Sequence, residues 1–256
     1  MKNEEISVIT VCYNSEKTIE KTFQSLLNQT DEDFEYIVID GASTDNTLSI
    51  IKKYKQIFGN KMTYISEKDN GLYDAMNKGI KMSHGKFIGI INSDDWYEKD
   101  AIETIKKAIN KYKDIDIFYG YIRIIKNNKE YMIRRNNYDF IFEGNGLIQH
   151  PTCFLRKELY DKYGMFDTKY KVCADQDLML RMVSKGAKYK GVDKIISNFV
   201  VGGISFKYNS CFEINDVRCK YNIISKKQKR NFIIRHLKSY LKQKISSYVN
   251  KLKDGI

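Results

Sequence analysis

Residues 87–97, which read FIGIINSDDWY, join a short apolar run to a polar, acidic corner. The run over 87–91 predicts a buried strand, because it is short, rich in isoleucine and bounded by turn-forming residues. In open α/β sheets, ligands bind beyond the carboxyl ends of the strands. Mg²⁺ and Mn²⁺ prefer oxygen ligands and need only one or two carboxylates when phosphates supply others. The corner over 92–95 is therefore a candidate platform for a metal and a diphosphate, and a plain turn that caps the next helix is the alternative.

The residues before this corner alternate between strand and helix patterns. Strand patterns over 6–13, 36–39 and 62–65 are each followed by apolar residues at helical spacing. Together with the strand over 87–91, they predict a βαβ series and a mostly parallel sheet.

Polar clusters follow all four of these strands, and the carboxyl ends of parallel strands lie at one edge of a sheet. The clusters are Tyr13-Asn14, Asp40, Asp69 and residues 92–95. Such an edge is typical of a nucleotide site. Neither G-x-G-x-x-G nor G-x-x-x-x-G-K-[ST] occurs in the chain, which disfavours ordinary dinucleotide or P-loop binding.

The pattern changes after a predicted helix over residues 98–112. Residues 115–133 predict a strand pair with an asparagine-rich turn, and residues 144–154 predict a loop that enters another strand. A helix is expected to open near residues 172–177, and a glycine-hinged segment over 199–205 closes the globular part.

Composition favours one large domain with an appendage. The 256 residues are 42% hydrophobic and 13% aromatic, which is ample for a packed core. Five cysteines without a C-x-x-C pair predict neither a zinc site nor a disulfide framework and fit a reducing cytosol. No apolar run approaches the roughly 18 residues of a membrane span, and the first residues do not resemble a signal peptide. We expect a cytoplasmic protein that is soluble or peripheral.

The formal net charge of +12 favours anionic partners, and much of it lies after residue 225. There, apolar residues recur at helical intervals opposite a face of lysines and arginines. A basic amphipathic helix over 225–253 could bind an anionic surface at the inner face of the cytoplasmic membrane. The alternatives are a helix packed on the domain with a solvated lysine face, or a contact within a homodimer. Nucleic-acid binding through the tail is a third class, and no specific nucleic acid is expected.

Taken together, the clusters resemble the inverting glycosyltransferases of family 2 from residue 6 to about residue 205. The resemblance lies in the order and spacing of several pieces, which are residues 6–14, 38–45, 66–79, 92–95 and 174–181. It implies the α/β GT-A fold, a mixed sheet with flanking helices, here with a C-terminal basic amphipathic extension. The implied division is a GT-A domain over 1–210 and a helical basic tail over 211–256. Within the domain, 1–97 would be the nucleotide-sugar half and 98–210 the acceptor half.

The resemblance also implies roles for individual residues. The base and ribose pocket would be lined by Thr10, Tyr13 and Asp40, with Asp69 and Asn77 nearby. Asn92 and Asp94 stand where the family has its D-x-D motif, so Asp94 would be the direct ligand of Mn²⁺ or Mg²⁺. Asp175 matches the Asp of the family's E-D motif, which is the catalytic base.

Three positions depart from the family pattern. Asn92 replaces the first Asp of D-x-D, and Ala174 replaces the Glu of E-D. Gly41 stands where many members have a second Asp that binds the nucleobase, which leaves the identity of the base open. Asp175 itself has an ordinary alternative reading as a first-turn helix acid.

The implied reaction moves a hexose or N-acetylhexosamine from a nucleotide-diphosphate sugar, with UDP expected, to a glycan or lipid-linked acceptor in surface polysaccharide synthesis. A divalent ion would stabilise the leaving diphosphate, and a positioned carboxylate would accept the acceptor proton. One base opposite the leaving group gives a single displacement with inversion. The alternative is a sugar-nucleotide-binding module without turnover, which the replacements at Asn92 and Ala174 keep open.

Four further residues are candidates for the acceptor side of the site. Trp96 could stack on an acceptor sugar or pack in the core. His150 could touch the diphosphate or acceptor, or only pack. Asp95 and Asp177 could face the acceptor, although Asp95 also reads as a turn or cap residue and Asp177 as a first-turn helix acid.

Overall fold

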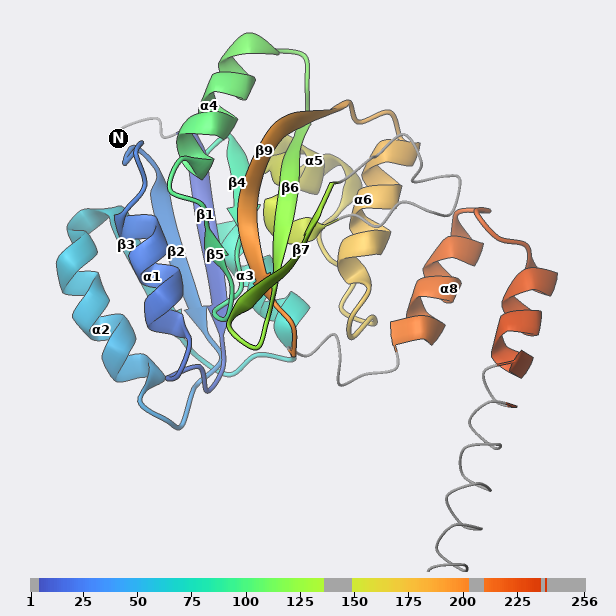
Figure 1. Cartoon of the computed structure of the whole chain (residues 1–256), viewed down its shortest axis with the longest axis horizontal. Helices are drawn as coiled ribbons and strands as arrows, with labels where there is room; N and C mark the ends of the chain where they lie inside the picture. Colours follow the sequence, from blue (N-terminus) through green and yellow to red (C-terminus); the bar gives the residue numbers. More distant parts are fainter. Residues whose placement is uncertain (1–4, 136–148, 203–209, 236–237, 239–256) are drawn as a thin grey trace, which may run out of the picture.

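The computed structural model describes residues 5–135, 149–202, 210–235 and 238. A single mixed sheet runs through the molecule and carries helices on both faces (Figure 1). Its strands follow the order β3-β2-β1-β4-β8-β6-β9-β5, with β7 paired to β6. The predicted mixed sheet with flanking helices is thus confirmed.

The first half of the chain forms the parallel part of the sheet. Its strands are β1 (Ile6–Cys12), β2 (Glu35–Asp40), β3 (Met62–Ser66) and β4 (Phe87–Ile90). Parallel pairing places Cys12 beside Asp40 and Asp40 beside Ser66. The carboxyl ends of these strands therefore lie at one edge, as the βαβ pattern predicts.

The connecting helices are α1 (Ile19–Leu27), α2 (Thr47–Phe58) and α3 (Leu72–Met82). Successive strand residues point to opposite faces, so Ile9 and Val11 pack with α3 whereas Val8 packs with α1 and α2. This alternation forms two apolar cores, one on each face of the sheet.

The second half of the chain extends the sheet with mixed pairing. Its strands are β5 (Trp96–Tyr97), β6 (Ile117–Lys126), β7 (Lys129–Arg134), β8 (Phe154–Arg156) and β9 (Tyr189–Val200). β8 joins the two halves, because it pairs antiparallel with both β4 and β6. β9 is parallel to β6 and antiparallel to β5.

The strand pair predicted near residues 115–133 is the β6–β7 hairpin. Its turn consists of Asn127 and Asn128, whose φ angles are +52° and +59°. Two consecutive residues with positive φ form the turn type that matches the twist of a hairpin, and asparagine tolerates that conformation.

The remaining helices cover the mixed part of the sheet. They are α4 (Ala101–Lys111), α5 (Lys157–Tyr163) and α6 (Ala174–Ser184), with short 3-10 turns at Gly59–Lys61 and His150–Thr152. α4 packs on the same face as α1 and α2, and α5 and α6 pack on the face of α3. In Figure 1, α6 lies between the sheet and the C-terminal helices.

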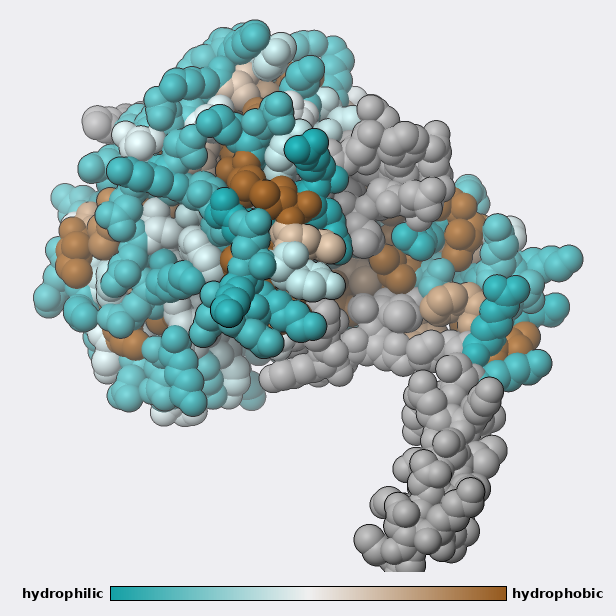
Figure 2. Space-filling model, viewed as in Figure 1, coloured by the Kyte–Doolittle hydropathy of each residue, from teal (hydrophilic) through white to brown (hydrophobic). Residues whose placement is uncertain are grey.

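Two helices follow the sheet, α8 (Ser210–Lys220) and a helix over 226–235. The second one begins with a reciprocal capping box, in which Ser225 N donates to Gln228 Oε1 at 2.7 Å and Gln228 N donates to Ser225 Oγ at 3.2 Å. Figure 2 shows mostly hydrophilic residues over this part and over much of the same face of the sheet domain. Among the described residues, no helix combines the length and apolarity that a membrane crossing requires. Most of the predicted amphipathic stretch, from 239 onward, lies outside the described residues.

Candidate active site

A cavity of about 900 Å³ opens at the carboxyl edge of the parallel strands. It is lined by residues that follow β1, β3 and β4, by the start of α3 and by the end of β9. The lining residues are Val11, Cys12, Tyr13, Asn14, Ser15, Glu16, Lys17, Thr18, Asp45, Asp69, Gly71, Leu72, Ala75, Asn92, Ser93, Asp94, Phe199 and Gly202. Four of the predicted site residues meet here, namely Tyr13, Asp69, Asn92 and Asp94.

Hydrogen bonds between loops give the cavity its wall. Asn14, at φ +50°, donates its backbone N–H to Ser43 Oγ at 2.8 Å and accepts from Thr44 N at 2.8 Å. Ser15 Oγ lies 2.8 Å from Ser93 Oγ and so joins the loop after β1 to the acidic corner. Tyr13 remains 61% exposed, with its ring available to a ligand.

The acidic corner divides its two carboxylates between different environments. Asp94 is half-buried at the cavity, and burial raises the pKa of its carboxyl. Asp95 has no exposed surface, and its Oδ1 accepts from Val200 N at 2.9 Å. Burial and the neighbouring Asp94 raise the pKa of Asp95 well above its usual range. Contrary to the expectation of an acceptor contact, Asp95 lies beneath the corner and holds the end of β9.

The oxygen atoms at this corner fit a hard divalent cation. Asn92 Oδ1 and Asp95 Oδ2 are buried without a hydrogen-bond partner, and the Asp94 carboxylate lies at the cavity. No group of three or more His, Cys, Asp or Glu side chains forms a metal cage among the residues that the structure describes. This donor set suits a cation that takes most of its ligands from phosphate and water.

Two predicted pocket residues lie beneath the cavity floor instead. Asp40 has no exposed surface and accepts hydrogen bonds from Ser43 Oγ at 2.5 Å and from Ser66 Oγ at 2.6 Å. Thr10 is equally buried, and its Oγ1 accepts from Tyr36 OH at 3.0 Å. Both differ from the expected lining role, because strand alternation turns these side chains into the sheet's packing layers.

Gly41 permits the close approach of Asp69. A Cβ atom at position 41 would lie 2.4 Å from Asp69 Oδ2 and 3.5 Å from Tyr13 Cδ2. The Asp69 carboxylate therefore occupies the space beside position 41, next to the exposed tyrosine ring. Gly41, which departs from the family pattern, therefore leaves the space that the Asp69 carboxylate fills.

Asp175 lies at the start of α6 and is not among the residues that line the cavity. Its Oδ1 accepts from Gln176 N at 2.8 Å and from Tyr73 OH at 3.4 Å, and burial raises its pKa to about 6. Tyr73 follows Leu72, which lines the cavity. A smaller hollow of about 170 Å³ also has Leu72 and Tyr73 in its wall.

Asn77 and His150 support this tyrosine from behind and do not reach the cavity. Asn77 Nδ2 donates to Phe166 O at 2.9 Å, and Phe166 N donates to Asn77 Oδ1 at 3.0 Å. The Phe166 ring stacks on Tyr73 at 5.3 Å and meets the edge of His150 at 5.4 Å. His150 is 6% exposed, and burial lowers its pKa to about 4, which keeps it neutral.

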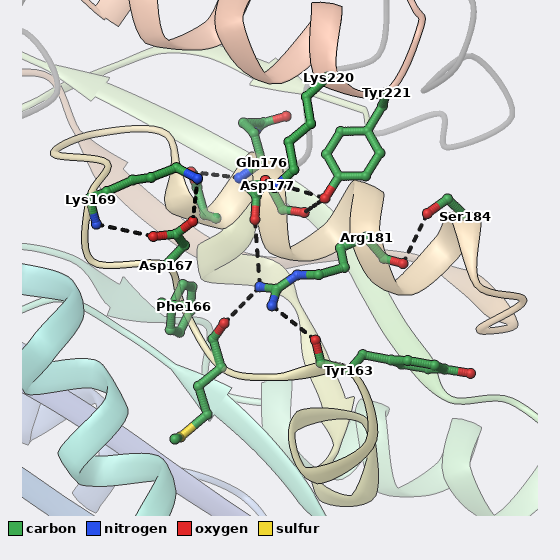
Figure 3. A network of polar contacts seen from close by, with 12 residues as sticks. Tyr163, Phe166, Asp167, Lys169, Gln176, Asp177, Arg181, Ser184, Lys220 and Tyr221 are labelled. Atoms are coloured by element: carbon green, nitrogen blue, oxygen red, sulfur yellow. Dashed lines mark hydrogen bonds and ion pairs between the residues drawn. The ribbon is translucent and has the colours of Figure 1, made fainter.

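The last two candidates also have protein partners. Asp177 is 1% exposed and contacts Lys220, Tyr221 and Arg181 (Figure 3). Trp96 lies under Lys21, whose Nζ is 3.1 Å from the ring centroid. Neither residue lines the cavity, so their proposed contact with an acceptor stays a prediction.

Several lining residues were not singled out by the sequence. Lys17 brings a cation to the cavity, and Phe199 and Gly202 bring the end of β9. The Gly-Gly pair at 202–203 was the available signal for that end. The sequence of residues 199–202 contains no pattern that predicts their position at the carboxyl edge of the parallel strands.

The sequence and the fold both match known glycosyltransferases. The profile described as "Glycosyl transferase family 2" matches residues 7–175. A PGL/p-HBAD biosynthesis glycosyltransferase of Mycobacterium bovis is 29% identical over 182 residues, which are 71% of this chain and 70% of that protein. Chondroitin synthase of Pasteurella multocida is 29% identical over 203 residues, which are 77% of this chain and 21% of that protein.

Solved structures with the same fold include TarS of S. aureus. Residues 1–349 of TarS in complex with UDP-GlcNAc match with a TM-score of 0.70 and 21% identity, over 91% of this chain and 71% of that one. The chain spans 43% of the longer TarS structure. The mannosyltransferase PcManGT of Pyrobaculum calidifontis, in complex with GDP-Man and Mn²⁺, matches with a TM-score of 0.67 and 16% identity, over 87% of this chain and 65% of that one.

The profile match covers the parallel half of the sheet, the acidic corner and the chain as far as Asp175. The fold likeness extends over the mixed half as well and confirms the expected GT-A architecture. The chain belongs to glycosyltransferase family 2 and is an enzyme of the glycosyltransferase class.

Proposed function

We propose that this protein transfers a hexose or N-acetylhexosamine from a UDP-sugar to a glycan or lipid-linked acceptor, with inversion, in the synthesis of a surface polysaccharide. The observation that carries the proposal is the shared cavity. One hollow of about 900 Å³ holds Tyr13, Asp69, Asn92 and Asp94. Leu72 lines the same hollow, and the next residue, Tyr73, donates a hydrogen bond to Asp175. The relatives named for PGL/p-HBAD and chondroitin synthesis support a glycan or glycolipid product.

In this proposal the donor lies along the strand ends. The exposed ring of Tyr13 stacks on the nucleobase, and the Asp69 carboxylate beside Gly41 accepts a hydrogen bond from it. Asp94 and Asn92 would hold Mn²⁺ or Mg²⁺ at the diphosphate. The cation supplies Lewis-acid stabilisation of the negative charge on the leaving diphosphate.

Asp175 is the proposed general base. Its carboxylate accepts the proton of the acceptor hydroxyl as the new glycosidic bond forms and the sugar–phosphate bond breaks. A positioned base of this kind contributes typically about 10²–10⁴-fold to the rate. The hydrogen bond from Tyr73 OH fixes one carboxylate oxygen, so the other can face the acceptor.

The second candidate is a sugar-nucleotide-binding module without turnover. Asn92 and Ala174, which replace two acidic residues of the family, favour it. It predicts UDP binding with no release of UDP from any UDP-sugar.

The basic tail is the proposed contact with an anionic membrane surface. The described helix over 226–235 carries Lys226, Lys227 and Arg230 on its exposed side. Each lysine or arginine near an anionic lipid surface contributes about 1 kcal/mol of binding. A homodimer contact through the same tail is the competing outcome and would appear in sedimentation as a doubled mass.

The donor site is tested by calorimetric titration with UDP, GDP and dTDP, each with and without Mn²⁺. We expect UDP to bind most tightly and to require the metal, and Asp94→Ala to lose the metal dependence. Equal affinity for the three nucleotides, or binding that ignores Mn²⁺, would overturn the donor-site assignment.

The catalytic assignment needs a second variant, Asp175→Asn. We expect UDP affinity to stay within about twofold and UDP release from UDP-GlcNAc, UDP-glucose or UDP-galactose to fall by about 10²–10⁴-fold. Glu103→Gln, on the exposed side of α4, is the control and should leave both quantities unchanged. Retention of UDP release in Asp175→Asn would assign the base elsewhere.

A further inference from the structure

The chain that leads into α6 is bound by a side chain from a different helix. Glu213, in the first turn of α8, accepts hydrogen bonds at Oε2 from Val172 N at 2.9 Å, Lys171 N at 3.0 Å and Cys173 N at 3.2 Å. Its Oε1 accepts from Lys171 N at 2.9 Å. The residue at the N-cap position, Cys173, makes no capping hydrogen bond with its own side chain. A glutamate 40 residues further along the chain therefore binds the backbone of the three residues that lead into α6.

The end of α8 makes a second attachment to the same helix. Lys220 Nζ donates to Asp177 Oδ1 at 2.6 Å, and Tyr221 OH lies 3.2 Å from the same oxygen (Figure 3). Asp177 is 1% exposed, so this ion pair is shielded from water on its carboxylate side. Removing the lysine would leave a buried carboxylate with weaker compensation.

Arg181 connects this attachment to the turn behind Tyr73. Its Nη2 lies 3.6 Å from Asp177 Oδ2, and the guanidinium donates to Tyr163 O at 2.9 Å and Met165 O at 2.6 Å. The next residue in that turn is Phe166, which stacks on Tyr73. Figure 3 shows this network as far as Phe166. The stacking of Phe166 on Tyr73 then gives α8 a second connection to the hydrogen-bond partner of Asp175.

The two attachments of α8 flank Asp175 in the sequence, with Glu213 bound at 171–173 and Lys220 bound at 177. We propose that Glu213 and Lys220 are positioning residues that fix the first turn of α6, so that α8 belongs to the catalytic unit. The proposal rests on the proposed role of Asp175 as the base.

Positioning matters here because a general base must lie within hydrogen-bond reach of the proton it accepts. Glu213 binds the backbone N–H groups of the three residues before α6, and Asp175 is the second residue of that helix. A displacement of about 1 Å at a reacting group can cost on the order of 10²-fold in rate. The Glu213 carboxylate therefore affects catalysis through the placement of Asp175, although it lies outside the cavity.

The test compares Glu213→Ala and Glu213→Gln in the full chain with the control Glu103→Ala. Glu103 is also a first-turn glutamate, on α4, and it pairs with Lys107 and Thr30 far from α6. The kcat and KM for UDP release are measured with whichever of the three UDP-sugars the unmodified chain turns over. Hydrogen exchange of the amides at 171–176 is followed by mass spectrometry.

For Glu213→Ala we expect kcat to fall by about 10- to 100-fold, KM to stay within twofold, and the amides at 171–176 to exchange faster. Glu213→Gln keeps one accepting oxygen and should recover part of kcat and part of the amide protection. Glu103→Ala should match the unmodified chain. Wild-type kcat in Glu213→Ala, despite faster exchange at 171–176, would overturn the positioning role.

Lys220→Met provides the same test if Glu213→Ala fails to fold. Its control is Lys229→Met, which removes an ion pair with the half-exposed Asp216 on the neighbouring helix. We expect a fall in kcat without a change in KM for Lys220→Met only. Equal kcat in both variants would overturn the proposal. Failure of the proposed function is a different result, because Asp175→Asn would then retain UDP release.

Discussion

Asp175 has a pKa of about 6, raised by burial, and only its ionised form can accept a proton. The fraction of ionised carboxylate falls tenfold for each pH unit below the pKa. We therefore expect kcat for UDP release to rise about tenfold per unit up to about pH 6 and to level off above it. The measurement is a pH–rate profile between pH 4.5 and 8.5.

UDP affinity measured across the same pH range is the control for this profile, since an acid-unfolded protein loses binding as well as rate. A rate that is higher at pH 5 than at pH 7 would contradict the assignment of Asp175 as the base. Burial also raises the pKa of Asp94, but the group faces the proposed cation, which would hold it ionised.

Gly41 and Asp69 form a pair that can be tested as a unit. A methyl group at position 41 would lie 2.4 Å from Asp69 Oδ2, so Gly41→Ala must displace the carboxylate. We expect Gly41→Ala and Asp69→Ala each to weaken UDP binding by about 10- to 150-fold, which corresponds to the roughly 1.5–3 kcal/mol of one hydrogen bond to a charged group. The double variant should bind UDP no more weakly than Asp69→Ala alone.

Additive losses in that cycle would show that Gly41 and Asp69 act independently, and that the close approach has no bearing on the donor. Calorimetry with UDP measures all four proteins. Thermal unfolding checks that the Gly41→Ala backbone is intact.

Among the elements, β4 and β8 form the seam between the parallel and mixed parts of the sheet. Gly89, on β4, lies against Phe154 of β8, and a Cβ atom there would come within 2.5 Å of the phenylalanine ring. Both residues are buried, so the ring has little room to move. We expect Gly89→Ala to destabilise the fold by about 1–3 kcal/mol through overpacking.

Urea unfolding measures this loss, with Gly89→Ala and Phe154→Leu combined as the compensating variant. The smaller leucine should restore part of the stability that the methyl group removes. A Gly89→Ala protein as stable as the unmodified chain would mean that the two sheet parts separate easily at this seam.

The elements that the sequence predicted well are those with strong local patterns. β1 to β4 and their helices follow from apolar runs and helical periodicity, and the Asn127-Asn128 turn follows from residues that tolerate positive φ. β5 has only two residues, and β9 has a half-exposed, irregular pattern, so neither has a local signature. The pairing of β9 with β5 and with β6 is decided by contacts about 75 to 100 residues apart in the chain.

The same division applies to the site. Tyr13, Asp69, Asn92 and Asp94 meet because parallel strands share one edge, which sequence order alone predicts. Asp177 looked like any first-turn acid, since its partners Lys220 and Tyr221 lie more than 40 residues later. The positions of Asp40 and Thr10 beneath the cavity depend on which face of the sheet each side chain takes. A shift of one residue along the strand would move each side chain to the other face.

At the scale of the whole molecule, charge is distributed unevenly about the fold. The formal net charge is +12. The described helix over 226–235 has five cationic residues among ten and no acidic residue. A capping box forms its first turn. α8 and the ion pair between Lys229 and Asp216 link this helix to α6. A surface that bound the tail would therefore be connected, through these two ion pairs, to the helix that carries Asp175.

Charge reversal in this tail tests the proposed membrane contact. The variant Lys226→Glu, Lys227→Glu and Arg230→Glu lowers the net charge by six, because each substitution replaces +1 by −1. Lys52→Glu, Lys107→Glu and Lys111→Glu, all on α2 and α4, lower it equally and form the matched control. In sedimentation with phosphatidylserine–phosphatidylcholine vesicles, we expect the tail variant to lose binding by at least tenfold and the control to lose much less, since attraction to the surface acts within a Debye length of about 8 Å at physiological salt. Equal losses in both variants would assign vesicle binding to net charge alone and remove the tail from the membrane proposal.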